Sequence, residues 1–186
     1  MPLPPLLILA VVSGIAAAVA GRHELRQSPR PIFLTRTFSS FVGFALLVLV
    51  PISAYFYVFH GDWFLLYLFD VTRIPSALAL IGFLLEAVLG ALGFLGGAIL
   101  VRNQRETIAL GVIGAFVVGG AVSVFFYYDR LAQVGTFAQF HGQSGQFGLE
   151  PFENGSLITG GLVMGAIALL GLAALLGRLW MAGRAR

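Results

Sequence analysis

The sequence contains no cysteine and no lysine, and only 10% of its residues are charged. The absence of cysteine excludes disulfide bonds and thiolate metal sites, and it leaves the redox compartment open. Soluble domains carry about 25% charged residues, so this composition is typical of a chain that folds in lipid. The longest polar stretch extends only from Asp129 to Ser156, which leaves no separate soluble domain.

Sequence signatures of common catalytic sites are also absent. The chain has no glycine-rich nucleotide loop followed by lysine, no HExxH helix, no GxSxG turn and no CxxC pair. A net charge of +3 can indicate nucleic-acid binding, but the placement of the arginines gives a better explanation. We therefore predict no nucleic-acid partner and no cofactor, and we favour a protein that is not an enzyme.

Five apolar stretches dominate the chain. A helix needs about 20 apolar residues to cross the hydrocarbon core of a membrane. The predicted membrane helices cover residues 3–20, 38–59, 75–101, 107–128 and 157–180, and the segments 60–74 and 129–156 form a cap at one end. We therefore predict an all-α integral membrane protein, with residues 1–186 forming a single transmembrane domain of five helices.

The first apolar stretch has a second interpretation. Ala18-Val19-Ala20 before Gly21 resembles the cleavage site of a signal peptide. However, no positive charge precedes the stretch, whereas Arg22 and Arg26 follow it. We interpret it as a membrane helix.

The arginines predict an orientation. Nine of the eleven lie in residues 21–37, in residues 102–106 or in the tail from Arg178, and all three segments fall on one side of a five-helix bundle. The opposite side holds only Arg73 and Arg130. Because arginine is enriched on the cytoplasmic side, we predict an external N-terminus and a cytoplasmic C-terminus. The preference for arginine over lysine suggests the cytoplasmic (inner) membrane of a bacterium with GC-rich DNA.

One carboxyl group, Glu86, interrupts the third apolar stretch. At 1.5 Å per residue it lies about 16 Å from the outer end of its helix, where a charge costs about 2.5–3.5 kcal/mol. We therefore expect a neutral carboxyl that faces other helices. Its predicted partners are Ser13 and the carbonyl group of Leu47, which Pro51 leaves without its helical hydrogen bond. Pro51 also predicts a kink.

Glu86 has two interpretations. Intramembrane carboxyl groups commonly bind protons or ions in channels and carriers. A neutral carboxyl can instead join helices through a hydrogen bond worth about 0.6 kcal/mol. No basic residue lies at this depth in another predicted helix, and no second acidic group forms a relay. The structural interpretation is therefore favoured, and protonation of Glu86 remains the alternative.

Glycines recur at helical spacing around Glu86 and again in the last apolar stretch. Small residues three or four positions apart let membrane helices approach closely. The predicted helix-packing residues are Gly82, Gly90, Gly93, Gly97, Gly161 and Gly165. Contacts within the chain are the simpler interpretation, and contacts with another subunit or a second copy are the alternative.

The predicted outer side carries a loose set of polar residues. They are His60, Asp62, Asp70, Asp129, His141 and Glu150. Histidine and carboxylates can bind metals, but these residues follow no recognised ligand spacing, and we predict no metal site. Aromatic residues at 55–69 and 125–128 are typical of an interfacial belt, against which a lipid or quinone could bind.

Three functional hypotheses follow. The first is a non-catalytic subunit or scaffold element of a larger membrane complex, assembled through glycine-faced helices, with lipids and other subunits as partners. The second is a channel or proton-coupled carrier that uses Glu86. The third is a membrane enzyme that acts on a lipid or quinone through the outer polar and aromatic groups.

Overall fold

The computed structural model describes residues 5–54, 76–133 and 156–184, and apart from short turns this part of the chain is helical, with no strand. The first apolar stretch forms α1 (Pro5–Ala20), followed by the short α2 (Arg22–Gln27) and η1 (Ile32–Leu34). The second forms α3 (Arg36–Phe44), η2 (Ala45–Leu49) and α4 (Val50–Ala54). The remaining helices are α6 (Ser76–Arg102), α7 (Glu106–Gln133) and α10 (Ser156–Arg184).

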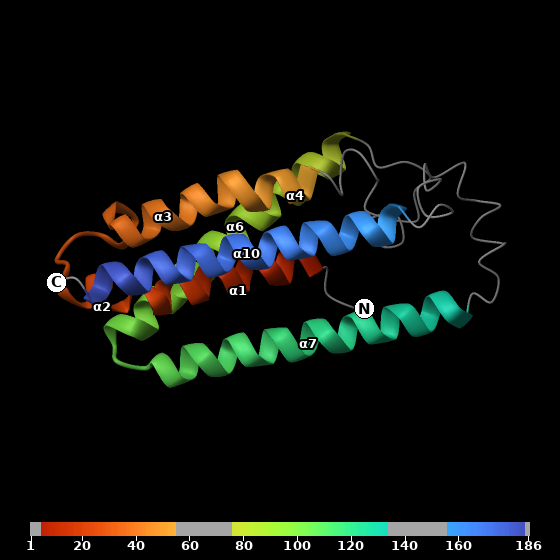
Figure 1. The fold of residues 1–186 in the computed structure, drawn as a ribbon. Helices are drawn as coiled ribbons and strands as arrows, with labels where there is room; N and C mark the ends of the chain where they lie inside the picture. Colours follow the sequence, from red (N-terminus) through yellow and green to blue (C-terminus); the bar gives the residue numbers. More distant parts are fainter. Residues whose placement is uncertain (1–4, 55–75, 134–155, 185–186) are drawn as a thin grey trace.

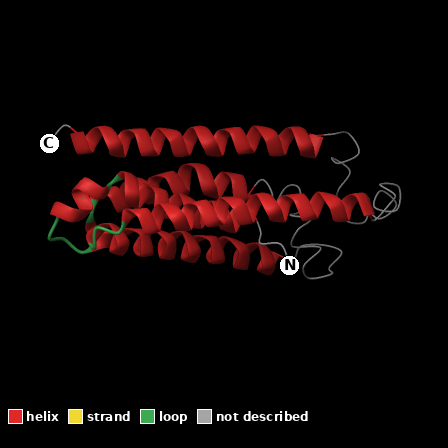
Figure 2. Ribbon diagram, turned by 90° about the horizontal axis from the view of Figure 1, so that it is seen from below, coloured by secondary structure: helices red, strands yellow, loops and turns green. Residues whose placement is uncertain are grey.

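The long helices lie side by side, and successive ones run in opposite directions (Figure 1). Helix α1 packs most extensively on α6 and also contacts α3, α7 and α10. Helix α10 lies along one side of the bundle, where it contacts α1, α2, α3 and η2 (Figure 2). The buried cluster is therefore built around α1, with aromatic side chains from α3 and α6.

Three helices in the described ranges are long and apolar enough to cross a membrane, namely Arg36–Ala54, Leu80–Arg102 and Val163–Gly183. Two further apolar helices, Leu6–Ala20 and Glu106–Val122, are shorter over their described side chains. The described part of the chain is thus that of an all-helical membrane protein. Five spans and the direction of the termini stay predictions.

Two helical segments differ from the sequence-based expectation. Residues 22–27, predicted as part of a polar link, form α2. Two hydrogen bonds join α2 to the end of α6. Arg102 donates to the Leu25 carbonyl oxygen at 3.1 Å, and Arg26 donates to the Val101 carbonyl oxygen at 3.2 Å. Helix α7 continues to Gln133, into the segment assigned to the outer cap. Hydropathy indicates where the apolar stretch of a helix ends, whereas the backbone hydrogen bonds of that helix can continue into the polar residues that follow.

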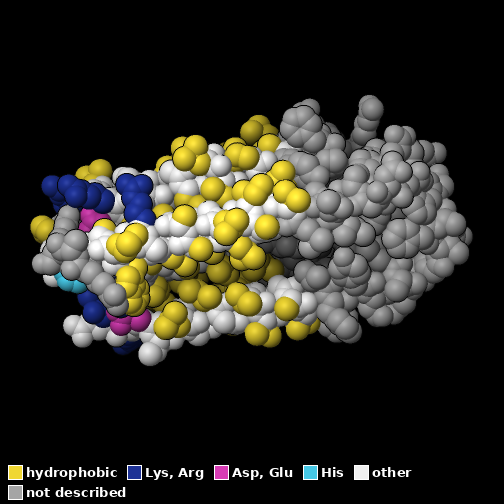
Figure 3. Space-filling view, in the orientation of Figure 1, with side chains coloured by type: hydrophobic (Ala, Val, Ile, Leu, Met, Phe, Trp, Pro, Cys, Tyr) yellow, Lys and Arg dark blue, Asp and Glu magenta, His cyan; other side chains and the backbone are white. Residues whose placement is uncertain are grey.

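The described arginine side chains gather at one end of the bundle. Figure 3 shows them around the end that holds α2 and the C-terminus, and the α6–α7 turn lies at the same end in Figure 1. The apolar side chains cover the helices between this end and the residues drawn in grey. If this end faces the cytoplasm, it follows the usual enrichment of arginine there, and the orientation stays a prediction.

Candidate functional site

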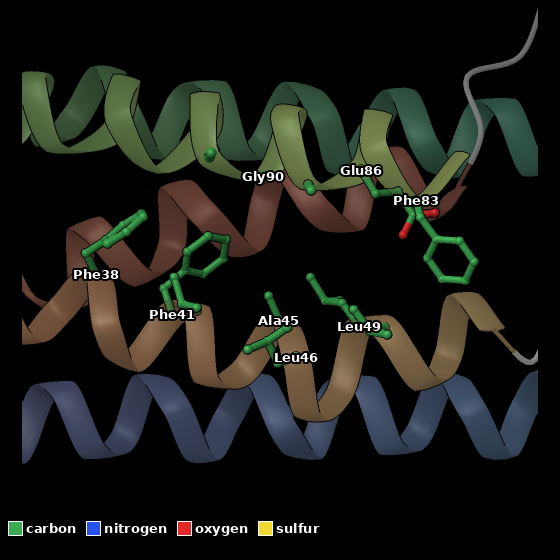
Figure 4. A pocket seen from close by; sticks show the side chains of 12 residues that line it. Phe38, Phe41, Ala45, Leu46, Leu49, Phe83, Glu86 and Gly90 are labelled. Atoms are coloured by element: carbon green, nitrogen blue, oxygen red, sulfur yellow. The ribbon is translucent and has the colours of Figure 1, made fainter. Parts of the chain in front are cut away.

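A cavity of about 200 Å³ lies between α6 and the helix formed by α3, η2 and α4. Its lining is apolar except for Glu86, which lies near one end beside Phe83 (Figure 4). Phe38 and Phe41 line the other end, where both rings contact the fully buried Phe94 at centroid distances of 5.2 and 5.4 Å. The cavity therefore has an aromatic end and a carboxyl end.

Local sequence explains why the two helices leave this space. On α6 the cavity is lined by small residues, including Ala87 and Gly90, so few atoms extend toward the opposite helix. On that helix, η2 is a π-helical turn that ends two residues before Pro51. Proline removes a helical donor, and such widened turns often occur at breaks in regular hydrogen bonding. The predicted kink stays a prediction.

The carboxyl group of Glu86 accepts a hydrogen bond from the hydroxyl of Ser53 in α4. Both residues are buried, with 7% and 1% of their surface exposed. This bond joins α4 to α6 at the carboxyl end of the cavity. A buried carboxyl needs such a partner, because an unsatisfied polar group in an apolar environment costs about 1–3 kcal/mol.

The structure gives Glu86 a partner, Ser53, that the sequence analysis did not name. Ser13 is buried in α1, where its hydroxyl donates to the carbonyl oxygen of Ala10 at 2.9 Å. Leu47 lies in the π-helical turn η2, and its carbonyl group stays a predicted partner. Sequence reasoning missed Ser53, although it carries the only hydroxyl group between residues 41 and 54 and was therefore a visible candidate.

Three of the predicted packing glycines lie against α1. A methyl group added at Gly93 would come within 2.6 Å of the Val11 carbonyl oxygen, and one at Gly97 within 3.1 Å of the Ile15 Cα. Gly90 faces Ala10 at ordinary contact distance. From the α1 side, Gly14 is equally close to the backbone of α6. We call this set of contacts the glycine seam.

The other predicted packing glycines are placed differently. Gly82 is buried in α6, whereas a methyl group added at Gly165 would meet no atom within 4 Å. Gly161 belongs to α10, but its surroundings lie outside the described residues. Gly165 is therefore not part of the seam, and the prediction for Gly161 stays untested.

Most of the predicted outer polar set lies outside the described residues. This applies to His60, Asp62, Asp70, His141 and Glu150, while Asp129 lies in the described backbone of α7 without a described side chain. Among the described residues, no group of three histidine or acidic side chains lies together. The prediction of no metal site and the lipid and quinone hypotheses for this outer end stay untested.

No protein family model, curated protein or solved structure matches this chain. The fold and the site therefore define only a class, an all-helical membrane protein with a buried carboxyl at the end of an apolar cavity.

Proposed function

We propose that the protein is a non-catalytic subunit or assembly element of a larger membrane complex, bound to its partners through α7 and α10. The supporting observation is the placement of small residues on their outer faces. Methyl groups added at Gly111 and Gly114 of α7, or at Gly177 of α10, would meet no atom within 4 Å. Ala115 and Ala173, which belong to the same faces, are exposed.

The glycine seam shows what such residues do in this chain. At the seam, glycine allows α1 and α6 to approach backbone to backbone. A glycine inside a helix costs about 1 kcal/mol relative to alanine, and the seam offsets that cost by close packing. Gly111, Gly114 and Gly177 carry the same cost, but a methyl group added at any of them would meet no described atom within 4 Å. A helix of another subunit would supply the missing packing.

The spacing of the exposed small residues fits this role. Gly111 and Ala115 lie four residues apart on α7, as do Ala173 and Gly177 on α10. This is the small-x3-small pattern of closely packed membrane helices. Each face lies opposite the side of its helix that is buried in the bundle, where Ala109 of α7 is fully covered. The two faces are therefore available at the same time.

Purification in a gentle detergent, followed by mass measurement of the intact assembly, tests the proposal. We expect a stable complex that Gly114→Leu or Gly177→Leu reduces at least 10-fold in yield, because leucine prevents close approach of a partner helix. The control is Gly96→Leu, an exposed glycine of α6 outside both faces. A monomer from unmodified protein, or equal loss with the control, contradicts the proposal.

A second function, proton coupling through Glu86, is favoured by the burial of a carboxyl beside a cavity between helices. The Glu86→Gln variant separates the two functions. Its amide oxygen can still accept the hydrogen bond from Ser53, but it cannot exchange a proton. For an assembly element we expect unchanged complex yield and no change in proton flux across liposomes loaded with a pH-sensitive dye. A proton flux that Glu86→Gln abolishes, with assembly intact, would favour the carrier instead.

A further inference from the structure

A second cavity, of about 310 Å³, lies at the arginine-rich end between α2 and the last turns of α10. Arg22, His23 and Arg26 line it from α2, and Trp180 and Gly183 line it from α10. Unlike the cavity beside Glu86, it is lined by polar as well as apolar groups. It lies at the end of the apolar span Val163–Gly183, and therefore at the level of the lipid headgroups.

The side chains of this cavity are held in place by specific contacts. The guanidinium of Arg22 lies over the Trp180 ring, with its carbon 4.9 Å from the ring centroid. Gly183 allows α10 to pass close to α2, because a methyl group there would be only 3.3 Å from the Cβ of His23. The close passage of the two helices sets the position of the ring beneath the arginine.

The electrostatic balance of the cavity is positive. Arg26 is paired with Glu106, so much of its charge is compensated. Arg22 rests on an aromatic ring, which leaves its full charge at the cavity. The nearest acidic residue in sequence, Glu24, is directed to α3, where it accepts hydrogen bonds from Thr37. An anion at the cavity would therefore meet the positive charge of Arg22.

We propose that this cavity binds the phosphate headgroup of an anionic phospholipid, with Arg22 as the principal cationic contact and Arg26 as a second. The guanidinium group presents several N–H donors that match the oxygens of a phosphate. The apolar surface of α10 continues from the cavity into the membrane, with Leu169, Leu170 and Met181 mostly exposed. This surface accommodates the acyl chains, which a free phosphate lacks.

Native mass spectrometry of the detergent-solubilised full chain, titrated with phosphatidylglycerol or phosphatidylcholine, tests the proposal. We expect phosphatidylglycerol to bind more tightly than phosphatidylcholine. Arg22→Gln should weaken phosphatidylglycerol binding about 5-fold, because one arginine near anionic lipid contributes about 1 kcal/mol. Arg22→Lys keeps the charge and should retain binding within about 2-fold. Arg105→Gln is the matched control, because it removes a charge at the same end, in the exposed α6–α7 turn.

Three outcomes would overturn the proposal. Equal binding of the two lipids would show that the headgroup charge is not recognised. An equal loss of affinity in Arg105→Gln would show that binding depends on the overall charge of this end instead of on the cavity. Full competition by inorganic phosphate at the same concentration as the lipid would identify a site for the free ion. Unfolding curves of each variant show whether a loss of binding reflects a loss of fold.

Discussion

Replacing Gly93 by leucine will strongly destabilise the fold, whereas the same replacement at Gly96 will leave its stability nearly unchanged. At Gly93 even a methyl group would lie 2.6 Å from the carbonyl oxygen and 3.1 Å from the Cα of Val11. These are backbone atoms of α1, so no side-chain rotation relieves the clash and the helices must separate. Overpacking commonly costs about 1–3 kcal/mol, and we expect at least about 3 kcal/mol here because the obstacle is backbone.

The loss of this contact affects the whole bundle. Helix α1 is central to the bundle, because it contacts α3, α6, α7 and α10. Its most extensive packing is with α6. Contacts of α1 with α7 and α10 depend on its position, so a shift at the glycine seam disturbs these helices as well.

Unfolding by titration with sodium dodecyl sulfate, followed by circular dichroism and tryptophan fluorescence, measures the effect. A methyl group added at Gly96 would meet no atom within 4 Å, so Gly96→Leu should change stability by less than about 1 kcal/mol, with a gain in helix propensity. If the two variants were equally stable, the glycine seam would not determine the packing of α1 on α6.

Much of the helical architecture was predictable from the sequence because lipid imposes one rule on every span. Backbone groups in a membrane must be satisfied within the helix, so long apolar runs form helices. This argument identified the runs that became α6 and α10. It could not predict α2, because Arg22–Gln27 is short and polar and its stability comes from contacts with Arg102, which lies far away in the sequence.

The candidate site was predictable only in part. A lone carboxyl in an apolar run is visible in the sequence, and burial of Glu86 follows from its cost in lipid. Its partner depends on the rotation and register of α4 against α6, which one-dimensional spacing does not determine. Depth alone suggested Ser13 and the Leu47 carbonyl, whereas the structure places Ser53 at the carboxyl. The cavity was likewise invisible, since it depends on the π-helical turn Ala45–Leu49.

The second large effect is expected at Glu24, which connects α2 to the first turn of α3. Its carboxylate accepts hydrogen bonds from the backbone N–H groups of Arg36 and Thr37, both at 2.9 Å, and from the Thr37 hydroxyl at 2.8 Å. The first N–H groups of a helix have no partner within it. The Glu24 carboxylate accepts hydrogen bonds from two of them, and the Thr35 hydroxyl oxygen accepts one from a third, the N–H of Phe38.

We therefore expect Glu24→Ala to lower the free energy of unfolding by about 2 kcal/mol, since loss of a helix cap costs about 0.5–2 kcal/mol and hydrogen bonds to charged groups contribute about 1.5–3 kcal/mol. Hydrogen exchange of the Thr37 and Phe38 amides should accelerate with it. Glu106→Ala is the matched control, because Glu106 pairs with Arg26 at the same end, with side chains 26% and 38% exposed. Exposed pairs contribute only about 0–1 kcal/mol.

The comparison separates two explanations for the order of the arginine-rich end. If its order came from net attraction between charges, removal of either glutamate would cost the same. If the order comes from hydrogen bonds to the first N–H groups of α3, only the Glu24→Ala variant will be strongly destabilised. Only that variant will then show faster hydrogen exchange of the Thr37 amide. Equal losses in both variants would contradict the capping role. Because α2 also lines the cavity at Arg22, the Glu24→Ala variant should in addition weaken phosphatidylglycerol binding, and Glu106→Ala should not.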